Sequence, residues 1–361
     1  MYLSGVALQS ELCLLFRRAI DQESLVCYAK LVLVRKNLSF LVLILLFGIF
    51  WPVSYFYFPS SVKILDEKVV QSNPKVLNKE RLALVKDYGD FLEKGLPENN
   101  PLLYFYWFSN QRKISDLRVK RAVEEIKNTN VEAGKIKVWS LLNMGAVVKT
   151  NKHTIAFDIA NLFFSSAHND LADVADIFLV THGDRDHFDS GFLKKAVENN
   201  KKIIFPKGFG FGSSKPENLF FISSGQTINI DGVKITAYQT DHRGDGNFSE
   251  PGAWFVVEVD GFKLLHTGDG RDFKNKNEQE KVYSMKNIDI LLGNNTLHSY
   301  NIRDLNPKVY IPMHLYKFMS GGDLYRESRI ENVLSTHQQY EKELKGIEKL
   351  YLLPGESVLL P

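Results

Sequence analysis

A series of short apolar runs, each ended by turn-forming residues, fills the chain from Lys135 onward and constrains the fold more than any other feature. Runs such as TIAFDIA, ADIFLVT and FKLLHTG have the β-branched and aromatic content of strands. Helical patterns separate several of them, at about Ser190–Asn199, Asn275–Lys286 and Tyr325–Lys345. Strands that outnumber the interleaved helices predict an α/β fold with stacked sheets and helices outside.

The region before these runs, about residues 61–134, is charged and helical in period. Candidate helices lie near Val76–Lys94 and Arg112–Asn128, separated by the turn-forming sequence LPENNP. We therefore predict a helical linker region over residues 61–134. One large domain, long enough to bury a full core, is predicted over residues 135–361.

An uncharged apolar segment at 38–58, LSFLVLILLFGIFWPVSYFYF, precedes both regions. Its 21 residues suffice to cross a hydrocarbon core of about 30 Å as a helix. Trp51, Tyr55 and Tyr57 gather toward one end, as aromatics do at a membrane interface. A buried core helix is the alternative, but no comparable segment flanks it, and the pattern favours a transmembrane anchor.

The charges on either side of this segment predict its orientation. Several lysines and arginines precede it, whereas lysines and acids are mixed in the segment that follows. By the positive-inside rule, residues 1–37 form a cytoplasmic N-terminal segment and the large domain is extracytoplasmic. The long N-terminal stretch and the lack of a small-x-small pattern after Phe58 favour an uncleaved single-pass anchor over a signal peptide.

Net charge and cysteine content exclude some partners and some kinds of active site. The formal net charge of +3 is too small to indicate a nucleic-acid partner, and none is expected. The only two cysteines, Cys13 and Cys27, both precede the predicted anchor. The large domain therefore has neither a cysteine nucleophile nor thiolate metal ligands, and it suits an oxidising compartment.

The densest group of chemically active residues is the stretch VTHGDRDHFD, directly after the predicted strand ADIFLVT. It brings His182, Asp184, Asp186 and His187 into one loop, and we expect Ser190 to cap the helix that follows. Carboxylates packed this closely repel one another or take up protons, and a cation removes the conflict. Taken alone, the stretch favours a metal site, and an exposed polar turn is the alternative.

Other predicted strands end in residues of the same kind. These residues are Asp158, His242, Asp269 and His314. A strand end is where a rigid scaffold presents side chains to one edge of a sheet. Together with the loop after ADIFLVT, they predict a metal site at that edge.

This ordered set resembles the metallo-β-lactamase superfamily, which has an early acid, an HxHxDH motif, a later histidine, an aspartate in a TGD phrase and a final histidine. The matching residues here are Asp158, 182–187, His242, 267–269 and His314. The resemblance covers residues 135–361 and implies a four-layer αββα sandwich with a two-metal site at one edge. The chain is loosely similar to the branch of the ascorbate-6-phosphate lactonase and the N-acylphosphatidylethanolamine phospholipase D. It departs from that branch at 143–145, Asn-Met-Gly, where "GH" is usual.

The resemblance also implies which residues bind each metal ion. The ligands of the first ion would be His182, Asp184 and His242. The ligands of the second ion would be Asp186, His187 and His314, with Asp269 bridging both ions. Asp186 would also act in catalysis by directing the attacking water and accepting its proton.

Three further residues are expected close to the metal ions. Asp158 would orient a metal ligand from behind. Arg243 is positioned in the chain to bind an anionic oxygen, and a polar connection is its alternative role. His266 is expected to support the ligands or face the substrate, and a hydrogen-bonded core histidine is the alternative.

Asp184 is a departure from the family, which usually has histidine there. A carboxylate is a harder donor, so manganese or iron becomes more favourable, while zinc still tolerates it. We expect two divalent ions, zinc first. Flavodiiron proteins of the superfamily also carry a carboxylate at this step.

A bound divalent ion lowers the pKa of water from about 15.7 to near 7. The sequence therefore predicts a membrane-anchored hydrolase that uses metal-bound hydroxide on a phosphodiester, lactone or other ester of a small molecule or lipid. Two alternatives stay open. One is a non-catalytic metal-binding membrane module, in which the first site is empty, and the other is a di-iron oxidoreductase.

Overall fold

The computed structural model describes residues 62–93, 101–161, 166–210, 216–241, 252–315 and 330–361. All of them belong to one compact unit, Val62–Pro361. The predicted cytoplasmic segment 1–37 and the predicted anchor 38–58 lie outside the described residues. Within those residues, no helix combines the length and the apolar character that crossing a membrane requires.

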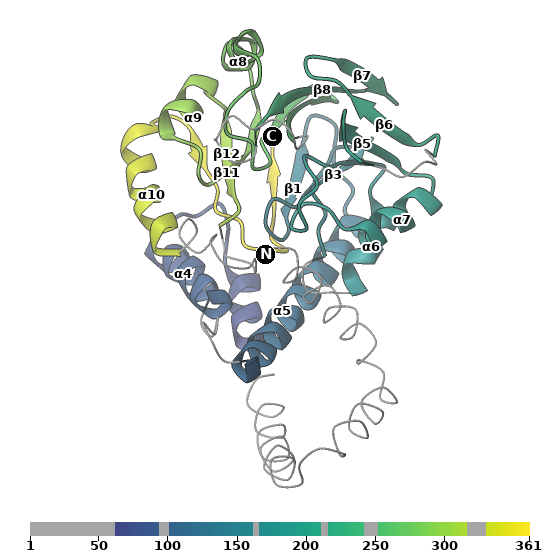
Figure 1. Ribbon diagram of the computed structural model, residues 1–361. Coiled ribbons are helices and arrows are strands. Elements are labelled where there is room, and N and C mark those ends of the chain that lie inside the picture. The colour runs from purple at the N-terminus through teal and green to yellow at the C-terminus, as the bar shows by residue number, and fades with distance from the viewer. Residues whose placement is uncertain (1–61, 94–100, 162–165, 211–215, 242–251, 316–329) are drawn as a thin grey trace, which may run out of the picture. The chain divides into compact units, whose positions relative to one another are not determined.

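Two seven-stranded sheets form the centre of this unit among the described residues (Figure 1). The first sheet has the order β14 (Ser357–Leu360), β1 (Ile136–Ser140), β2 (Ala146–Lys149), β3 (Thr154–Phe157), β4 (Ile177–Leu179), β5 (Lys202–Pro206) and β6 (Leu219–Ile222). The second has the order β13 (Glu348–Lys349), β12 (Val309–Met313), β11 (Ile290–Asn294), β10 (Phe262–His266), β9 (Gly252–Val259), β8 (Val233–Thr240) and β7 (Thr227–Ile230). Strands β3 to β6 are parallel, as are β10 to β13.

Helices cover the outer face of each sheet. The first sheet carries α5 (Pro101–Asn128), α6 (Ser166–Val174) and α7 (Ser190–Glu198), and the second carries α8 (Lys276–Tyr283), α9 (Ser299–Leu305) and α10 (Ile330–Glu343). Figure 1 shows α6 and α7 on one side of the paired sheets and α9 and α10 on the other. The layers are therefore helix, sheet, sheet and helix, as the α/β prediction requires.

Apolar side chains fill both faces of the sheets. Phe255 and Val257 of β9 point into the core between the sheets, whereas Trp254 and Val256 point out toward the helices. Because both faces are buried, such strands read as continuous apolar runs rather than alternating ones. This is the physical origin of the runs that dominate the sequence.

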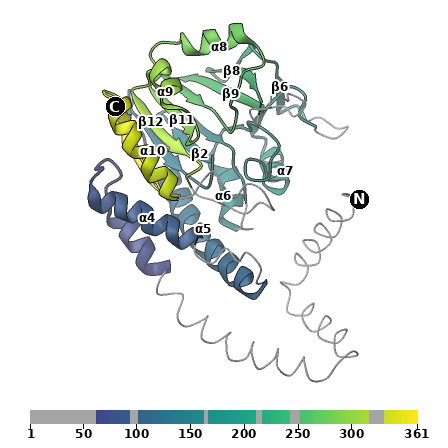
Figure 2. The same ribbon diagram turned by 60° about the vertical axis from the view of Figure 1, so that its left-hand side comes forward.

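The region predicted as a helical linker packs against the rest of the unit. A helix over residues 62–71 and α4 (Lys79–Glu93) share an apolar cluster with Tyr351, Leu353 and Leu315. The Arg81 guanidinium is buried and donates to Glu356. Both views show α4 beside α10 (Figures 1 and 2). This region is therefore part of the folded unit and does not act as a loose connection.

Some element boundaries differ from the predictions. Helix α5 begins at Pro101, well before the predicted Arg112, and α6 and α9 had no predicted counterpart. The apolar run KLYLL, residues 349–353, is of the kind that predicts a strand, but β13 covers only Glu348–Lys349. The rest of the run is buried, and the Leu350 N–H still donates to the Tyr310 carbonyl of β12 at 3.0 Å.

Candidate metal centre

The predicted site residues lie at one edge of the two sheets, where the parallel strands end. Asp158 follows β3 directly, the 182–187 loop follows β4, Asp269 follows β10 and His314 follows β12. The backbone carbonyl of Thr181 accepts from the Ala253 N–H at 3.1 Å, which links the end of β4 to the start of β9. This bond joins the two sheets beside the site.

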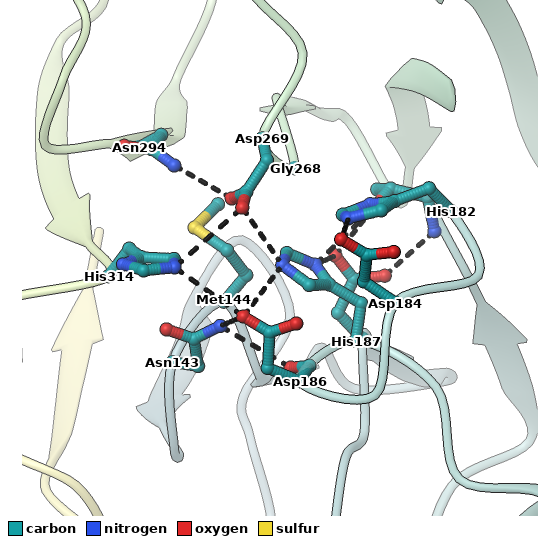
Figure 3. A network of polar contacts seen from close by, with 12 residues as sticks. Asn143, Met144, His182, Asp184, Asp186, His187, Gly268, Asp269, Asn294 and His314 are labelled. Carbon is teal, nitrogen blue, oxygen red and sulfur yellow. Dashed lines mark hydrogen bonds and ion pairs between the residues drawn. The ribbon is translucent and has the colours of Figure 1, made fainter. Parts of the chain in front are cut away.

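Four residues bring ligand atoms together there: Asp186, His187, Asp269 and His314, called the ligand cluster below. One ligand atom from each lies within 4.8 Å of the others. The Nε2 atom of His187 is 3.3 Å from Oδ2 of Asp269, and Nε2 of His314 is 3.7 Å from the same oxygen. Figure 3 shows the four side chains pointing toward one another. Two imidazoles and two carboxylates are a donor set for a divalent transition-metal ion.

The bonding of His187 tests whether a metal ion fits. Its Nδ1 is hydrogen-bonded to Oδ2 of Asp158 at 2.8 Å. Its Nε2 is buried, faces the carboxylates of Asp186 and Asp269, and makes no hydrogen bond with the described residues. With the ring proton held on Nδ1, Nε2 presents a lone pair to a cation between those carboxylates. The residues therefore fit a metal ion.

Asp158 lies behind the ligand cluster, on the Nδ1 side of His187. It is fully buried and accepts from the backbone N–H and the hydroxyl of Thr181, both at 2.7 Å. Burial raises the pKa of the Asp158 carboxyl, but the charge and hydrogen bond of His187 outweigh burial and leave this pKa lowered. An ionised Asp158 fixes the tautomer and the ring orientation of His187.

The charges within the ligand cluster shift its protons onto the imidazoles. Burial lowers the pKa of His187, but the carboxylates of Asp269, Asp186 and Asp158 outweigh it and hold this pKa well above the usual value. The pKa of His314 is raised for the same reason, by Asp269 and Asp186 against burial. A metal ion would replace these protons, because histidine ligates in its neutral form.

The residues predicted to bind the first ion are brought together less closely. His182 lies beside the ligand cluster, with its ring centroid 3.9 Å from that of His187. Its Nε2 is 3.7 Å from Oδ2 of Asp184, whose side chain is 46% exposed. Neither residue belongs to the four-residue group. His242 and Arg243 lie outside the described residues.

Tight backbone geometry shapes the loops that carry the ligands. The backbone N–H of His187 donates to the Asp184 carbonyl at 2.9 Å, which folds the motif into a helical turn. Gly268 has φ +50°, and a Cβ there would lie 2.5 Å from the Thr181 hydroxyl. Only glycine fits this approach, which explains the glycine before Asp269.

The cap of α7 differs from the prediction. Asp189, not Ser190, is the N-cap, and its carboxylate accepts from the Phe192 N–H at 2.6 Å. Ser190 is the first residue of the helix instead. The cap fixes the end of the metal-binding loop, because Asp189 follows His187 by two positions.

The comparison with protein families matches residues 146–314 to the model described as "Beta-lactamase superfamily domain". This match, together with the curated relatives, supports the assignment of residues 146–314 to the metallo-β-lactamase superfamily. The matched residues begin at the first residue of β2 and end at His314, so they include the whole ligand cluster.

Curated superfamily relatives are similar over this part of the chain. The UPF0173 metal-dependent hydrolase of Methanosarcina barkeri is 23% identical over 199 residues, which is 51% of this chain and 80% of that protein. The UPF0173 metal-dependent hydrolase of Polynucleobacter asymbioticus is 29% identical over 174 residues, 40% of this chain and 60% of that protein. These names place the chain among the metal-dependent hydrolases of the superfamily.

Solved structures are also similar to the chain, at low sequence identity. Igni18, a metallo hydrolase from Ignicoccus hospitalis, has a TM-score of 0.46 and 17% identity, covering 63% of this chain and 99% of that one. CmlA, a diiron beta-hydroxylase from Streptomyces venezuelae, has a TM-score of 0.47 and 13% identity, covering 64% of this chain and 54% of that one.

His266 lies in the core of this superfamily domain. It is fully buried, its Nε2 donates to the Met144 carbonyl at 3.0 Å, and its Nδ1 accepts from the Gly268 N–H at 3.2 Å. Its ring stacks on Phe157 with the centroids 4.9 Å apart. His266 therefore holds the loop before Asp269 in place from within the core.

Two asparagines of the site were not predicted from the sequence. Asn143 donates from Nδ2 to Oδ2 of Asp186 at 2.7 Å, and Asn294 donates from Nδ2 to Oδ1 of Asp269 at 2.7 Å. Asn143 was noted only as a departure from "GH" in the sequence. The signal for Asn294 was its place at the end of the run IDILLG, the same signal that marked Asp269 and His314.

Proposed function

We propose that this metal-dependent hydrolase cleaves an ester, namely a phosphodiester, a lactone or another ester of a small molecule or lipid. The ligand cluster at the carboxyl ends of the strands carries the proposal. Three of its four residues have partly exposed side chains, with Asp186 33%, Asp269 16% and His314 23% exposed. The site is therefore shielded yet open to a small polar group.

The metal ion supplies the electrophilic chemistry, because a bound divalent cation makes water more acidic and polarises a substrate oxygen. Within the protein, the four residues of the ligand cluster would hold the ion, and Asn294 keeps one oxygen of Asp269 engaged. Asp158 keeps the Nδ1 proton of His187 in place. These contacts leave Nε2 of His187 and Oδ2 of Asp269 facing the centre.

Asp186 is the residue proposed to direct the attacking water. Burial raises the pKa of its carboxyl, but the charges of His187 and His314 outweigh burial and leave this pKa lowered. The carboxylate is therefore ionised at neutral pH and partly exposed. It can accept a hydrogen bond from water and set the direction of attack.

The metals are proposed to be two divalent ions, zinc first, with manganese or iron favoured more than usual by the carboxylate of Asp184. If only the ligand cluster is filled and nothing is hydrolysed, the chain is a metal-binding module instead. A redox-active pair of iron ions would support the alternative that the protein is a di-iron oxidoreductase. The carboxylate-rich donor set is the observation that keeps iron as an alternative.

Metal content and turnover, measured on the same full-length sample, test the proposal. The protein is stripped with a chelator, reloaded separately with zinc, manganese or iron(II), and assayed on bis(4-nitrophenyl) phosphate and on a lactone panel. Turnover that disappears on stripping and returns on reloading supports the hydrolase. Stoichiometric metal with no turnover of any substrate would overturn it.

We also propose that the segment 38–58 anchors the enzyme and that the hydrolase domain is extracytoplasmic. The support is the uncharged segment and the basic residues before it. Protease added to cells with a permeabilised outer layer should digest the domain while leaving a cytoplasmic marker intact. Full protection of the domain would reverse the orientation.

A further inference from the structure

Asn143 contacts two ligands of the cluster at once. Its Nδ2 donates to Oδ2 of Asp186 at 2.7 Å and lies 3.4 Å from the Asp186 backbone carbonyl. Its own backbone carbonyl accepts from the His314 N–H at 3.1 Å. Figure 3 shows Asn143 next to Asp186 and below His314, with its amide nitrogen turned to Asp186. Two ligands far apart in the sequence thus meet at one residue.

The conformation of Asn143 is unfavourable in two respects. Its φ is +57°, in the left-handed region, where asparagine is tolerated better than most residues but is still uncommon. Its Oδ1 is buried and has no hydrogen-bond partner among the described residues. A buried acceptor without a partner destabilises the fold. Such unfavourable features persist at sites where they serve a function.

The side chain of Asn143 therefore serves to hold Asp186. Among the described residues, both side-chain hydrogen bonds of Asn143 go to Asp186. An amide donor holds a carboxylate without adding positive charge, so it does not repel an incoming cation as a lysine would. The same residue fixes the backbone of His314, so the spacing between both ligands depends on it.

We propose that Asn143 is a positioning residue that holds Asp186 and His314 in ligating geometry before the metal ion binds, and that it thereby sets how tightly the ion is retained. This inference rests on the metal dependence of the proposed function, but it concerns retention of the ion and not the reaction. Ligands that are already in place lose less freedom when the ion binds.

The substitution Asn143→Gly separates the side chain from the backbone. Glycine adopts the left-handed conformation readily, so the carbonyl that accepts from His314 stays in place while the carboxamide is removed. The matched control is Asn287→Gly. Asn287 is exposed, has φ +59°, and lies just before the amino end of β11, away from the metal-binding edge.

The metal-stripped full-length variants are titrated with zinc against a chromophoric chelator, and their thermal unfolding is followed without metal. Loss of a residue that supports a metal ligand usually weakens metal affinity by about 10- to 100-fold. We expect this loss for Asn143→Gly, with control-like unfolding of the metal-free protein. Asn287→Gly should bind zinc as the wild type does. The cobalt(II)-loaded variant should also show a changed visible spectrum, because two ligands lose their fixed spacing.

Equal zinc affinity and equal cobalt spectra for both variants would overturn the proposal. So would a loss of metal-free stability in Asn143→Gly with unchanged zinc affinity, since that result assigns Asn143 to the fold alone. A wild type that binds zinc but hydrolyses no ester contradicts the proposed function and leaves this inference intact. A wild type that binds no metal contradicts both.

Discussion

The two halves of the predicted metal centre differ in how their ligands are held. In the ligand cluster, Asp158 holds His187 and Asn294 holds Asp269, each through a hydrogen bond of 2.8 Å or less. In the other half, His182 is buried with its Nδ1 3.0 Å from the Thr181 hydroxyl, whereas the side chain of Asp184 is 46% exposed. Supporting residues fix the orientation and basicity of metal ligands. The difference suggests that the ligand cluster is the tighter of the two sites.

Removing a ligand from each half should have unequal effects, and this is the largest effect expected. Asp269→Ala should leave the protein without stoichiometric metal and without turnover, because this carboxylate faces both histidines of the ligand cluster. Asp184→Ala should retain one ion. Metal content by mass spectrometry checks both, with Asp304→Ala on the exposed face of α9 as the control. Equal metal loss in the first two variants would remove the distinction between the halves.

The substitution Asp158→Asn tests whether the Asp158 carboxylate supports His187 as a metal ligand. It keeps the size of the side chain and removes its negative charge. The ring of His187 loses its ionised partner, so metal affinity should fall by about 10- to 100-fold. Chelator competition measures the change. An affinity like that of the wild type would show that Asp158 supports the fold and not the ligand.

The raised pKa values of His187 and His314 predict how metal binding depends on pH. Below these raised values both imidazoles carry protons that the ion must displace. Affinity should therefore rise with pH, by about tenfold per unit for each proton displaced, and level off above the raised pKa values. Calorimetry in buffers of different ionisation enthalpy counts the protons released. No proton release at neutral pH would contradict the charge balance described for the ligand cluster.

The smallest expected effect concerns the end of the metal-binding loop. Asp189→Ala should lower the free energy of unfolding by about 0.5–2 kcal/mol, because it removes the N-cap of α7. Ser190→Ala should change it little, since Ser190 makes no cap contact. Denaturant unfolding of the metal-free variants distinguishes them. A larger loss for Ser190→Ala would favour the cap predicted from the sequence.

The sequence was most informative where a residue of a metal-ligand type directly follows a predicted strand. Asp158, Asp269 and His314 were found because each is a ligand type directly after an apolar run, and parallel strands end at one edge. Asn143 and Asn294 lie at similar points, yet an asparagine is not a usual metal ligand, and its role appears only when its carboxylate partner is seen beside it.

Contacts distant in the sequence explain what the sequence could not predict. The charged texture of residues 61–134 suggested a linker, but the apolar face of α4 packs on Tyr351 and Leu353, more than two hundred positions away. The burial of the guanidinium of Arg81 against Glu356 is likewise visible only in three dimensions. The hydrophobic periodicity of the sequence shows which face of a helix is apolar. It does not show which part of the protein packs against that face.

The location of the metal in a zinc-loaded crystal of the protein, determined by anomalous diffraction at the zinc edge, tests the central claim most directly. We expect an anomalous peak within bonding distance of Nε2 of His187, Nε2 of His314, Oδ2 of Asp269 and a carboxylate oxygen of Asp186. A peak elsewhere on the chain, or none at this centre under saturating zinc, would contradict the assignment of the ligand cluster as the metal site.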